Sequence, residues 1–344
     1  MPADGGGAGT AVMAPGGATT AVPRRRAARP AGWGSYLLRR LGRLVVSLWV
    51  LVTFAFLIVH LIPGDPVRAA LGAQASPATV AAKRAELGLD NPLLQQYWTF
   101  LGNLLHGELG ESIKLQLPVS EIVSQRLPNT LVLAGLAFVL AVALAFPVGI
   151  GMAILTQRGR RRGTELGFAS VSVVLAAIPD FVLAVVLIAG LAVANTWLPA
   201  AYDGTSSSYV IPVVALAVGP AAVLARVIRV ETLGVLEEDF VRTARAKRLP
   251  PARVYLRHAV PNALTGALTV SGLVLAGLVA GTVLVETALS WPGLGPTMVD
   301  SIIGKDFPVV QAVVLVYGGL VLLINLAVDL LLAAVDPRST GARS

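Results

Sequence analysis

Residues 129–156 read NTLVLAGLAFVLAVALAFPVGIGMAILT, a stretch that contains no charged side chain. A helix needs about 20 predominantly apolar residues to cross the roughly 30 Å hydrocarbon core of a bilayer. This stretch exceeds that length, and it lacks the charged face that a helix on the surface of a soluble protein presents to water. It therefore predicts a membrane-spanning helix.

Further apolar stretches of similar length flank this one on both sides. They cover residues 41–62, 167–195, 210–230, 264–288 and 309–335. The whole chain is 55% hydrophobic and only 13% charged, with a mean hydropathy of +0.75. Soluble domains carry about 25% charged residues, so this chain has too little charge to cover a water-exposed surface of its size. We expect an all-α membrane protein with six transmembrane helices in a lipid bilayer.

The positive charges are distributed unevenly between the segments that join these stretches. Of the 27 Lys and Arg residues, 21 lie before or at Arg43, in 157–166, in 226–258 or after Asp336. Cytoplasmic loops of membrane proteins carry an excess of Lys and Arg. We therefore expect a multi-pass protein of the cell membrane with both termini in the cytoplasm. The net charge of +8 is accounted for by this topology and predicts no nucleic-acid partner.

The segments between the spans predict the domain organisation. A transmembrane core would cover 36–338, between a disordered cytoplasmic N-terminal tail, 1–35, and a short cytoplasmic tail, 339–344. Residues 63–128 are too polar for lipid and predict an external subdomain with two or three short helices, one from Pro92 to Leu105. Residues 231–263 form the one sizeable cytoplasmic element.

Several classes of site lack their characteristic residues. The chain has no cysteine, and its three histidines lie far apart in the sequence. No GxxxxGK[ST] sequence is present, so no phosphate-binding loop for ATP is predicted. We therefore expect no enzymatic activity, no metal and no cofactor bound by this chain.

The cytoplasmic element contains DFVRTARAK at 239–247 and LRHAVPNAL at 256–264, separated by a linker that includes Pro250 and Pro251. Acidic residues at its start and cations near its end suit the dipole of a helix. Leu233, Leu236, Phe240 and Ala244 recur at helical spacing and predict one apolar stripe. Because Pro251 can open a second helix, we expect two short amphipathic helices. Small residues would let a partner protein approach closely, and the cations would pair with acidic groups on it. We therefore expect this element to be a docking site.

This element resembles the "EAA" coupling loop of ABC importer permeases, in the wording of the oligopeptide, dipeptide and nickel group. Six further segments resemble the same family, in the same order along the chain. They are HLIPGDP (60–66), LGLDNPLLQQYWTFLGNLLHGELGES (87–112), AIPDF (177–181), VETALSWPGLG (285–295), KDFPVVQA (305–312) and LAVDLLLAAVDPR (326–338).

The resemblance implies a type I ABC importer permease fold that works within a larger assembly. Its implied partners are a second homologous permease, one or two kinds of ATP-binding subunit that hold ATP and magnesium, and an extracellular substrate-binding lipoprotein. The residues implied to couple the chain to the ATPase are Asp239, Phe240, Arg242, Thr243, Ala244, Arg245, Ala246, Lys247, Arg248, His258, Pro261 and Asn262. The family usually has glycine at the position of Arg248. Glycine suits the left-handed conformation at the end of a helix.

Cargo is less well determined by the sequence than the transport class. The resemblance implies import of dipeptides or oligopeptides, with glutathione, nickel or another chelated metal as alternatives. An ion-coupled secondary transporter would need inverted repeats and buried ionisable relays, and an intramembrane protease would need paired catalytic groups. Neither rival accounts for 237–262.

Asp180 is the single acid near the middle of its predicted span. It could line the pathway for a cationic peptide amino group, or it could bind amides freed where Pro179 interrupts the helix, and the sequence does not choose. Gly277 and Gly281 predict close helix packing, either within the chain or between two permeases. Residues 290–295 predict a structural plug at the outer face, and Asn325 and Asp329 predict a local hydrogen bond.

Overall fold

The computed structural model describes residues 33–61, 66–72, 74–86, 88–159 and 161–335. Most of the predicted N-terminal tail, the C-terminal tail at 339–344 and residues 62–65 lie outside this described part. Within it the fold is helical, without any β-strand, and one isolated bridge joins Glu111 to Pro118. The expectation of an all-α protein is confirmed.

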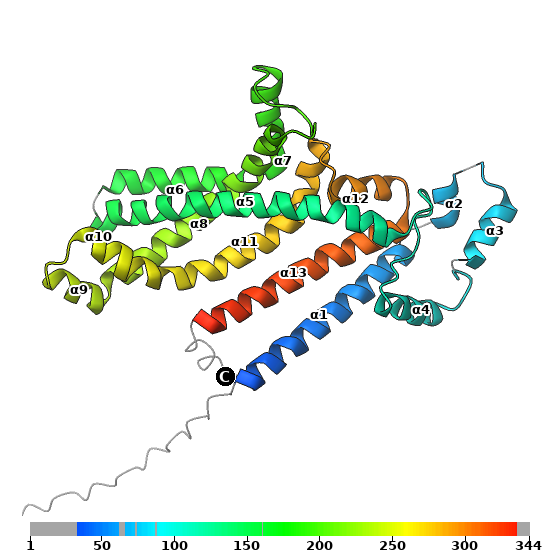
Figure 1. Ribbon diagram of the computed structural model, residues 1–344, viewed down its shortest axis with the longest axis horizontal. Helices are drawn as coiled ribbons and strands as arrows, with labels where there is room; N and C mark the ends of the chain where they lie inside the picture. The colour runs from blue at the N-terminus through cyan, green and yellow to red at the C-terminus, as the bar shows by residue number, and fades with distance from the viewer. Residues whose placement is uncertain (1–32, 62–65, 73, 87, 160, 336–344) are drawn as a thin grey trace, which may run out of the picture.

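Five long helices form the body of the molecule and run side by side along it (Figure 1). Each is long and apolar enough to cross a membrane. They are α1 (Trp33–Leu61), α5 (Val119–Thr156), α8 (Val210–Glu237), α11 (Val260–Ala288) and α13 (Phe307–Val335). Five of the six predicted spans are therefore single helices.

The predicted third span, 167–195, is not one continuous helix. It consists of α6 (Arg162–Ala177) and α7 (Asp180–Leu187), followed by a π-helical turn, η2 (Ile188–Val193), and the two parts meet at 91°. Pro179 and the residue before it have extended backbone angles, as expected because proline disfavours helical geometry in its predecessor. The described residues contain six candidate spans only if this bent pair counts as one.

Three helices extend furthest beyond the predicted boundaries. The first, α1, begins at Trp33, inside the segment predicted as tail, and α8 continues to Glu237 rather than ending near 230. The third, α5, begins at Val119, ten residues before the predicted start, and passes through Pro128 and Pro147. Val119 is fully buried and belongs to a core cluster, so tertiary packing extends this helix past its apolar sequence.

Short helices lie at the two ends of the bundle (Figure 1). At one end lie α2 (Pro66–Leu71), α3 (Pro77–Glu86), α4 (Leu93–Leu105) and α12 (Leu294–Ile303). The short helices α2, α3 and α4 agree with the two or three helices predicted between the first two spans, including the one after Pro92, and the external position of this segment stays a prediction. At the other end lie α9 (Asp239–Ala246) and α10 (Pro251–Arg253). We call these the α4 end and the α9 end.

Small residues allow the central helices to approach one another closely. Ala141 on α5 packs with Ala217 and Ala221 on α8. Near the α9 end, a Cβ atom added to Gly149 would lie 2.6 Å from the Ala225 carbonyl oxygen. Membrane helices associate through such close van der Waals packing because lipid provides no hydrophobic drive between them. This α5–α8 pair forms a rigid base for the α9 end.

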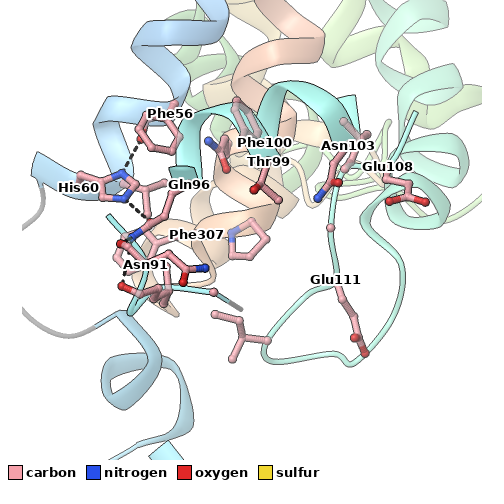
Figure 2. A pocket seen from close by; sticks show the side chains of 18 residues that line it. Phe56, His60, Asn91, Gln96, Thr99, Phe100, Asn103, Glu108, Glu111 and Phe307 are labelled. Atoms are coloured by element: carbon pink, nitrogen blue, oxygen red, sulfur yellow. Dashed lines mark hydrogen bonds between the residues drawn. The ribbon is translucent and has the colours of Figure 1, made fainter. Parts of the chain in front are cut away.

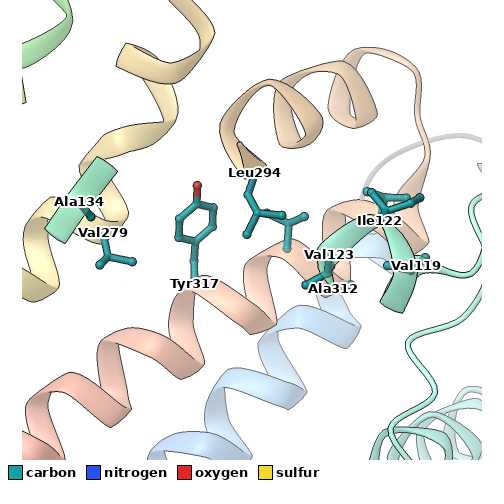
Figure 3. Packing of buried hydrophobic residues seen from close by; sticks show 10 residues of the cluster. Val119, Ile122, Val123, Ala134, Val279, Leu294, Ala312 and Tyr317 are labelled. Atoms are coloured by element: carbon teal, nitrogen blue, oxygen red, sulfur yellow. The ribbon is translucent and has the colours of Figure 1, made fainter. Parts of the chain in front are cut away.

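A larger apolar cluster joins helices near the α4 end. Figure 3 shows Leu294 of α12 next to Tyr317 of α13, with Val123 of α5 and Ala312 of α13 beyond it and Val119 of α5 at the far end of the same cluster. These side chains are buried in one contiguous cluster. The short helix α12 is therefore packed onto the bundle through Leu294.

Candidate coupling site

The first part of the predicted coupling loop is a short helix, α9, that turns away from α8. Glu238 separates the two helices with an extended backbone, φ −65° and ψ 150°. Asp239 stands in the first turn of α9, where a negative charge suits the helix dipole. The Thr243 hydroxyl donates to the Asp239 carbonyl oxygen at 2.9 Å.

The predicted apolar stripe is wrong at one position because of this break. Leu236 and Ala244 are buried, as expected, but Phe240 keeps 43% of its surface exposed. Val241 is fully buried in its place. A spacing of four residues places Leu236, Phe240 and Ala244 on one face only if the helix is continuous. The helix is interrupted at Glu238, and α9 is rotated so that Phe240 is exposed.

A small apolar cluster holds α9 against the end of the bundle. Its buried members come from α8, α9 and the following turn: Leu236, Val241, Ala244, Val254 and Ala259. Val235, Leu249 and Tyr255 pack around it. Because Ala244 faces this cluster, its small size serves internal packing and not the approach of a partner.

The turn after α9 keeps the geometry that the family's glycine would favour, although Arg248 occupies the position. Arg248 has φ +55°. Its N–H donates to the Arg245 carbonyl at 2.9 Å, and the Leu249 N–H donates to the Ala244 carbonyl at 3.4 Å. Together with the packing of Leu249 against the cluster, these bonds form a Schellman motif. A side chain with Cβ costs about 1–2 kcal/mol in this left-handed conformation.

The predicted second short helix does not stand alone. Pro251 opens α10 as expected, with Pro250 extended before it. The chain then continues through a π-helical turn, η4 (Val254–Ala259), directly into α11. Pro261 lies in the first turn of α11, directly after this π-helical turn, and such irregularities are where continuous helices accommodate proline. Any displacement of this turn therefore acts on a spanning helix.

Gln157, just after α5, connects both parts of the element to the bundle. Its amide nitrogen donates to the Tyr255 hydroxyl at 3.1 Å, and its amide oxygen accepts from the Arg245 guanidinium at 3.3 Å. Nearby, Arg229 of α8 donates to the Thr156 hydroxyl at 3.0 Å and pairs with Glu165 of α6 at 2.7 Å. These bonds tie the ends of α5, α6 and α8 to the coupling element.

The residues predicted for coupling are brought together at the α9 end of the molecule. Those exposed to the surroundings are Asp239, Phe240, Arg242, Thr243, Ala246, Lys247, Arg248, Pro261 and Asn262. Arg245 and His258 are half-buried. The His258 carbonyl accepts a bond from the Asn262 amide at 2.7 Å, so these two residues stabilise the start of α11. The outer surface of α9 and its turn carries one aromatic ring and several cations.

Asp180 lies at the sharp bend between α6 and α7, beside a cavity of 260 Å³. Ala176, Gly219, Pro220 and Gly277 also line this cavity. Among the described residues, no hydrogen bond or ion pair involves the Asp180 carboxylate. The proposal from the sequence that this side chain binds freed amides is therefore not what the structure shows. The carboxylate is half-buried and lies beside open space.

Sequence reasoning missed Glu286, which is fully buried in α11. Its Oε2 accepts from the Gly295 N–H at 2.7 Å, and the neighbouring Thr130 hydroxyl accepts from the Leu294 N–H at 2.9 Å. A Cβ atom at Gly293 would collide with the Glu286 carboxylate. An acid within an apolar span followed by two nearby glycines was the available signal.

The segment 290–295, predicted to form a structural plug, is firmly packed against α5, while its role as a plug at the outer face stays a prediction. Trp291 is buried, with 1% of its surface exposed, and its indole N–H donates to the Asn129 carbonyl at 3.2 Å. Asn129 in turn donates to the Pro292 carbonyl at 2.8 Å. Tyr202 and Tyr209 pack edge-on against the indole ring. The segment is therefore anchored to α5.

The structure adds detail to two predictions about helix packing, while packing of Gly277 and Gly281 between two permeases stays a prediction. Gly272 permits close contact between α11 and α13, since a Cβ atom there would collide with Val328. Gly277 has no described atom within 4 Å of such a Cβ position. Asp329, expected to bond with Asn325, forms an ion pair with Arg40 and joins α13 to α1. Among the described residues, no three His, Asp or Glu side chains gather into a metal-binding group.

Comparisons with known proteins agree with this arrangement. The glutathione transport system permease protein GsiC of Pectobacterium atrosepticum is 38% identical over 304 residues, which cover 88% of this chain and 98% of that protein. The protein of the same name from Escherichia coli K12 is 36% identical over 303 residues, with the same coverage. These relatives are permease proteins of a glutathione transport system. They give no support to the two alternatives, an ion-coupled secondary transporter and an intramembrane protease.

The fold also resembles solved ABC importers. The inward-facing MetNI methionine ABC transporter contains a chain that superimposes with a TM-score of 0.53 at 22% identity, covering 62% of this chain and 96% of that one. Residues 34–134 match the N-terminal region of binding-protein-dependent transport system membrane components. Residues 145–341 match the main family domain. The chain belongs to the family of binding-protein-dependent transport system inner membrane components, and it is a permease with the fold of ABC importers.

Proposed function

We propose that this permease forms half of the translocation pathway of an ATP-driven importer of short peptides, and that α9 is its contact with the ATPase. One observation supports the proposal above others. A buried cluster and a Schellman turn fix α9 to the end of the bundle, and the helix and the turn after it leave Phe240, Lys247 and Arg248 exposed. Aromatic and arginine side chains are enriched at protein contact surfaces.

The proposed partner at this surface is an ATP-binding subunit that carries the phosphate-binding loop absent from this sequence. A push on α9 would reach α8 through Leu236, which belongs to the cluster that contains Val241. It would reach α11 through η4, because no break separates these elements. Gln157 would carry the same displacement to α5. The coupling element thus connects one contact surface to three spanning helices.

The proposed orientation places the α9 end and both termini in the cytoplasm, and the α4 end outside. The distribution of Lys and Arg supports it, since 21 of 27 lie in segments assigned to the cytoplasm. We further propose a second homologous permease as the other half of the pathway. An external substrate-binding lipoprotein would deliver the cargo at the α4 end.

Short peptides, including glutathione, are the proposed cargo. Glutathione is itself a tripeptide, so the cargo for which these relatives are named agrees with the peptide class implied by the resemblance in sequence. A chelated metal such as a nickel complex remains the alternative. Asp180 is proposed to line the pathway, because its carboxylate lies beside a 260 Å³ cavity without a described partner. A peptide ammonium group is a suitable counterion for it.

The test of this function is purification of the tagged chain from its own host, followed by reconstitution of the whole complex. We expect an ATP-binding subunit, a second permease and a binding protein to co-purify. The reconstituted complex should take up labelled glutathione or dipeptides when ATP is supplied inside the vesicles. Uptake of a nickel complex without uptake of any peptide would overturn the cargo, and a chain that purifies with no nucleotide-binding protein would overturn the importer.

A matched pair of variants tests Asp180. Asp180→Asn keeps the side-chain size and removes the charge, whereas Asp203→Asn removes a charge from the exposed loop before η3 (Ser206–Tyr209). We expect the first variant to lose uptake of peptides with a free amino group and to retain more uptake of N-acetylated peptides. The second should behave as the parent protein. Equal uptake of both peptide kinds by Asp180→Asn contradicts the pathway role.

A further inference from the structure

One face of α4 carries a row of large apolar side chains that no described part of the chain covers. Leu94, Trp98 and Leu105 expose 68%, 64% and 86% of their surfaces. With the partly exposed Leu101, they recur at intervals of four, three and four residues, which places them on one side of the helix. A soluble monomer rarely leaves a continuous row of this kind open to water.

The opposite face of α4 is the more polar one, and it faces the protein. Gln96, Thr99 and Asn103 line a cavity of 210 Å³ between α1, α4 and the start of α13. Figure 2 shows these side chains around the cavity, with His60 of α1 bonded to Gln96 at 3.0 Å. A helix at a water-exposed surface has the reverse arrangement, with its apolar face inward. The arrangement of α4 fits an apolar environment outside it.

Contacts with α1 place α4 beside a membrane-spanning segment and not beyond its end. The Tyr97 hydroxyl lies 2.8 Å from the Thr53 hydroxyl, and the Tyr97 ring packs edge-on against Phe56. The apolar span of α1 continues to His60. At about 1.5 Å per residue, Thr53 lies roughly 10 Å inside that boundary. Part of α4 therefore lies at the depth of one lipid leaflet.

We propose that α4 is an interfacial helix whose Leu94–Trp98–Leu101–Leu105 face is embedded in that leaflet. Under the orientation proposed above, this is the external leaflet. The segment 91–107 contains no Asp, Glu, Lys or Arg, so entering lipid requires no charge to be buried. Tyr97 and Trp98 are the residue types enriched at membrane interfaces.

The neighbouring surface of α1 supports lipid as the occupant and not another protein. Phe54 and Leu57, on the same stretch of α1 that α4 packs against, expose 56% and 44% of their surfaces. The exposed row on α4 thus continues an apolar surface of a spanning helix. Anchored in the lipid in this way, α4 would fix the depth of α1 in the membrane and hold one wall of the 210 Å³ cavity in place.

Fluorescence quenching in the complete reconstituted transporter tests this inference. Because the chain has no cysteine, the variants Leu94→Cys, Trp98→Cys and Leu105→Cys each provide one labelling position on this chain. Ala82→Cys, on the exposed surface of α3, is the matched control. Each label is exposed to phospholipids that carry a nitroxide near the headgroup, and separately to iodide in the buffer. Partner subunits are used in cysteine-free form.

We expect nitroxide lipids to quench the labels at the three α4 positions and iodide to leave them bright, with the opposite result at Ala82→Cys. Quenching of the α4 labels by iodide would show that the row faces water and would overturn the inference. Labels quenched by neither agent would show that a second permease or the binding protein covers α4, which also overturns it. Neither outcome affects the proposed coupling role of α9, which lies at the other end of the molecule.

Discussion

Gln157 and Tyr255 are hydrogen-bonded at 3.1 Å across the junction between α5 and the π-helical turn η4, although 98 positions separate them in the sequence. Because Gln157 also accepts from Arg245 of α9, one side chain fixes the positions of both parts of the coupling element. This arrangement explains how a helix at the end of the bundle could act on the spans.

The Gln157 bridge can be tested by a double-mutant cycle. Tyr255→Phe removes only the hydroxyl, and we expect it to lower the uptake per ATP hydrolysed, since a hydrogen bond contributes about 0.5–1.5 kcal/mol. Gln157→Ala should lower it further, because both bonds are lost. Adding Tyr255→Phe to Gln157→Ala should have no extra effect. Fully additive losses in coupled transport would contradict a shared bridge.

The turn at Arg248 makes a prediction about stability. Arg248→Gly should stabilise the protein by about 1 kcal/mol, because glycine adopts the left-handed conformation without the Cβ penalty. Arg248→Ala removes the same charge and keeps Cβ, so it should not stabilise. Thermal unfolding of the purified chain in detergent distinguishes the two variants. Equal melting temperatures for both would show that charge, and not backbone conformation, determines the effect.

Phe240 and Val241 are neighbours with opposite environments, and their substitution should separate docking from folding. Val241 is fully buried in the α9 cluster, and Val241→Ala should cost about 2 kcal/mol through lost burial and a residual cavity. Phe240→Ala should leave the melting temperature unchanged. It should nonetheless weaken the association with the ATP-binding subunit, measured by the fraction that co-purifies. A stable Val241→Ala together with an unstable Phe240→Ala would reverse the assignment.

The turn around Glu286 predicts a strong effect from a small substitution. A Cβ atom at Gly295 would lie 2.7 Å from the Val283 carbonyl oxygen and 2.8 Å from Glu286 Oε2. We expect Gly295→Ala to lower the amount of folded protein sharply, as seen by size-exclusion chromatography. Gly319→Ala is the control, since no described atom lies within 4 Å of its Cβ position. Normal yields of Gly295→Ala would show that this turn can shift freely.

The sequence predicted the features that depend on local composition. Long uncharged stretches such as 129–156 identified five spans, and Pro251 correctly marked the start of α10. Pro179 indicated a possible interruption of the third span, but the apolar sequence on both sides of it gave no sign of a 91° change of direction. The merging of η4 with α11 was missed, because Pro250 and Pro251 mark where a helix begins and not where it ends. Phe240 is exposed because the chain turns at Glu238. The helical spacing of the apolar residues continues across this turn, so the sequence did not indicate it.

Buried polar contacts were the least predictable part of the site. Glu286 binds an amide nine residues away, and Gln157 binds a hydroxyl almost a hundred residues away. Neither residue type indicates such a partner by its local pattern. Arg248 illustrates the reverse case: its departure from the family's glycine was visible in the sequence, but only the structure shows that the left-handed turn is retained.

The central claim is that the exposed surface of α9 contacts an ATP-binding subunit. It is tested most directly by placing a photo-crosslinking amino acid at Phe240 in the complete transporter within its own host. We expect the crosslinked partner, identified by mass spectrometry, to be a protein with a GxxxxGK[ST] loop, and the same group at Trp98 to yield no such partner. A Phe240 position that crosslinks only to lipid, or to proteins without a nucleotide-binding loop, would contradict the account.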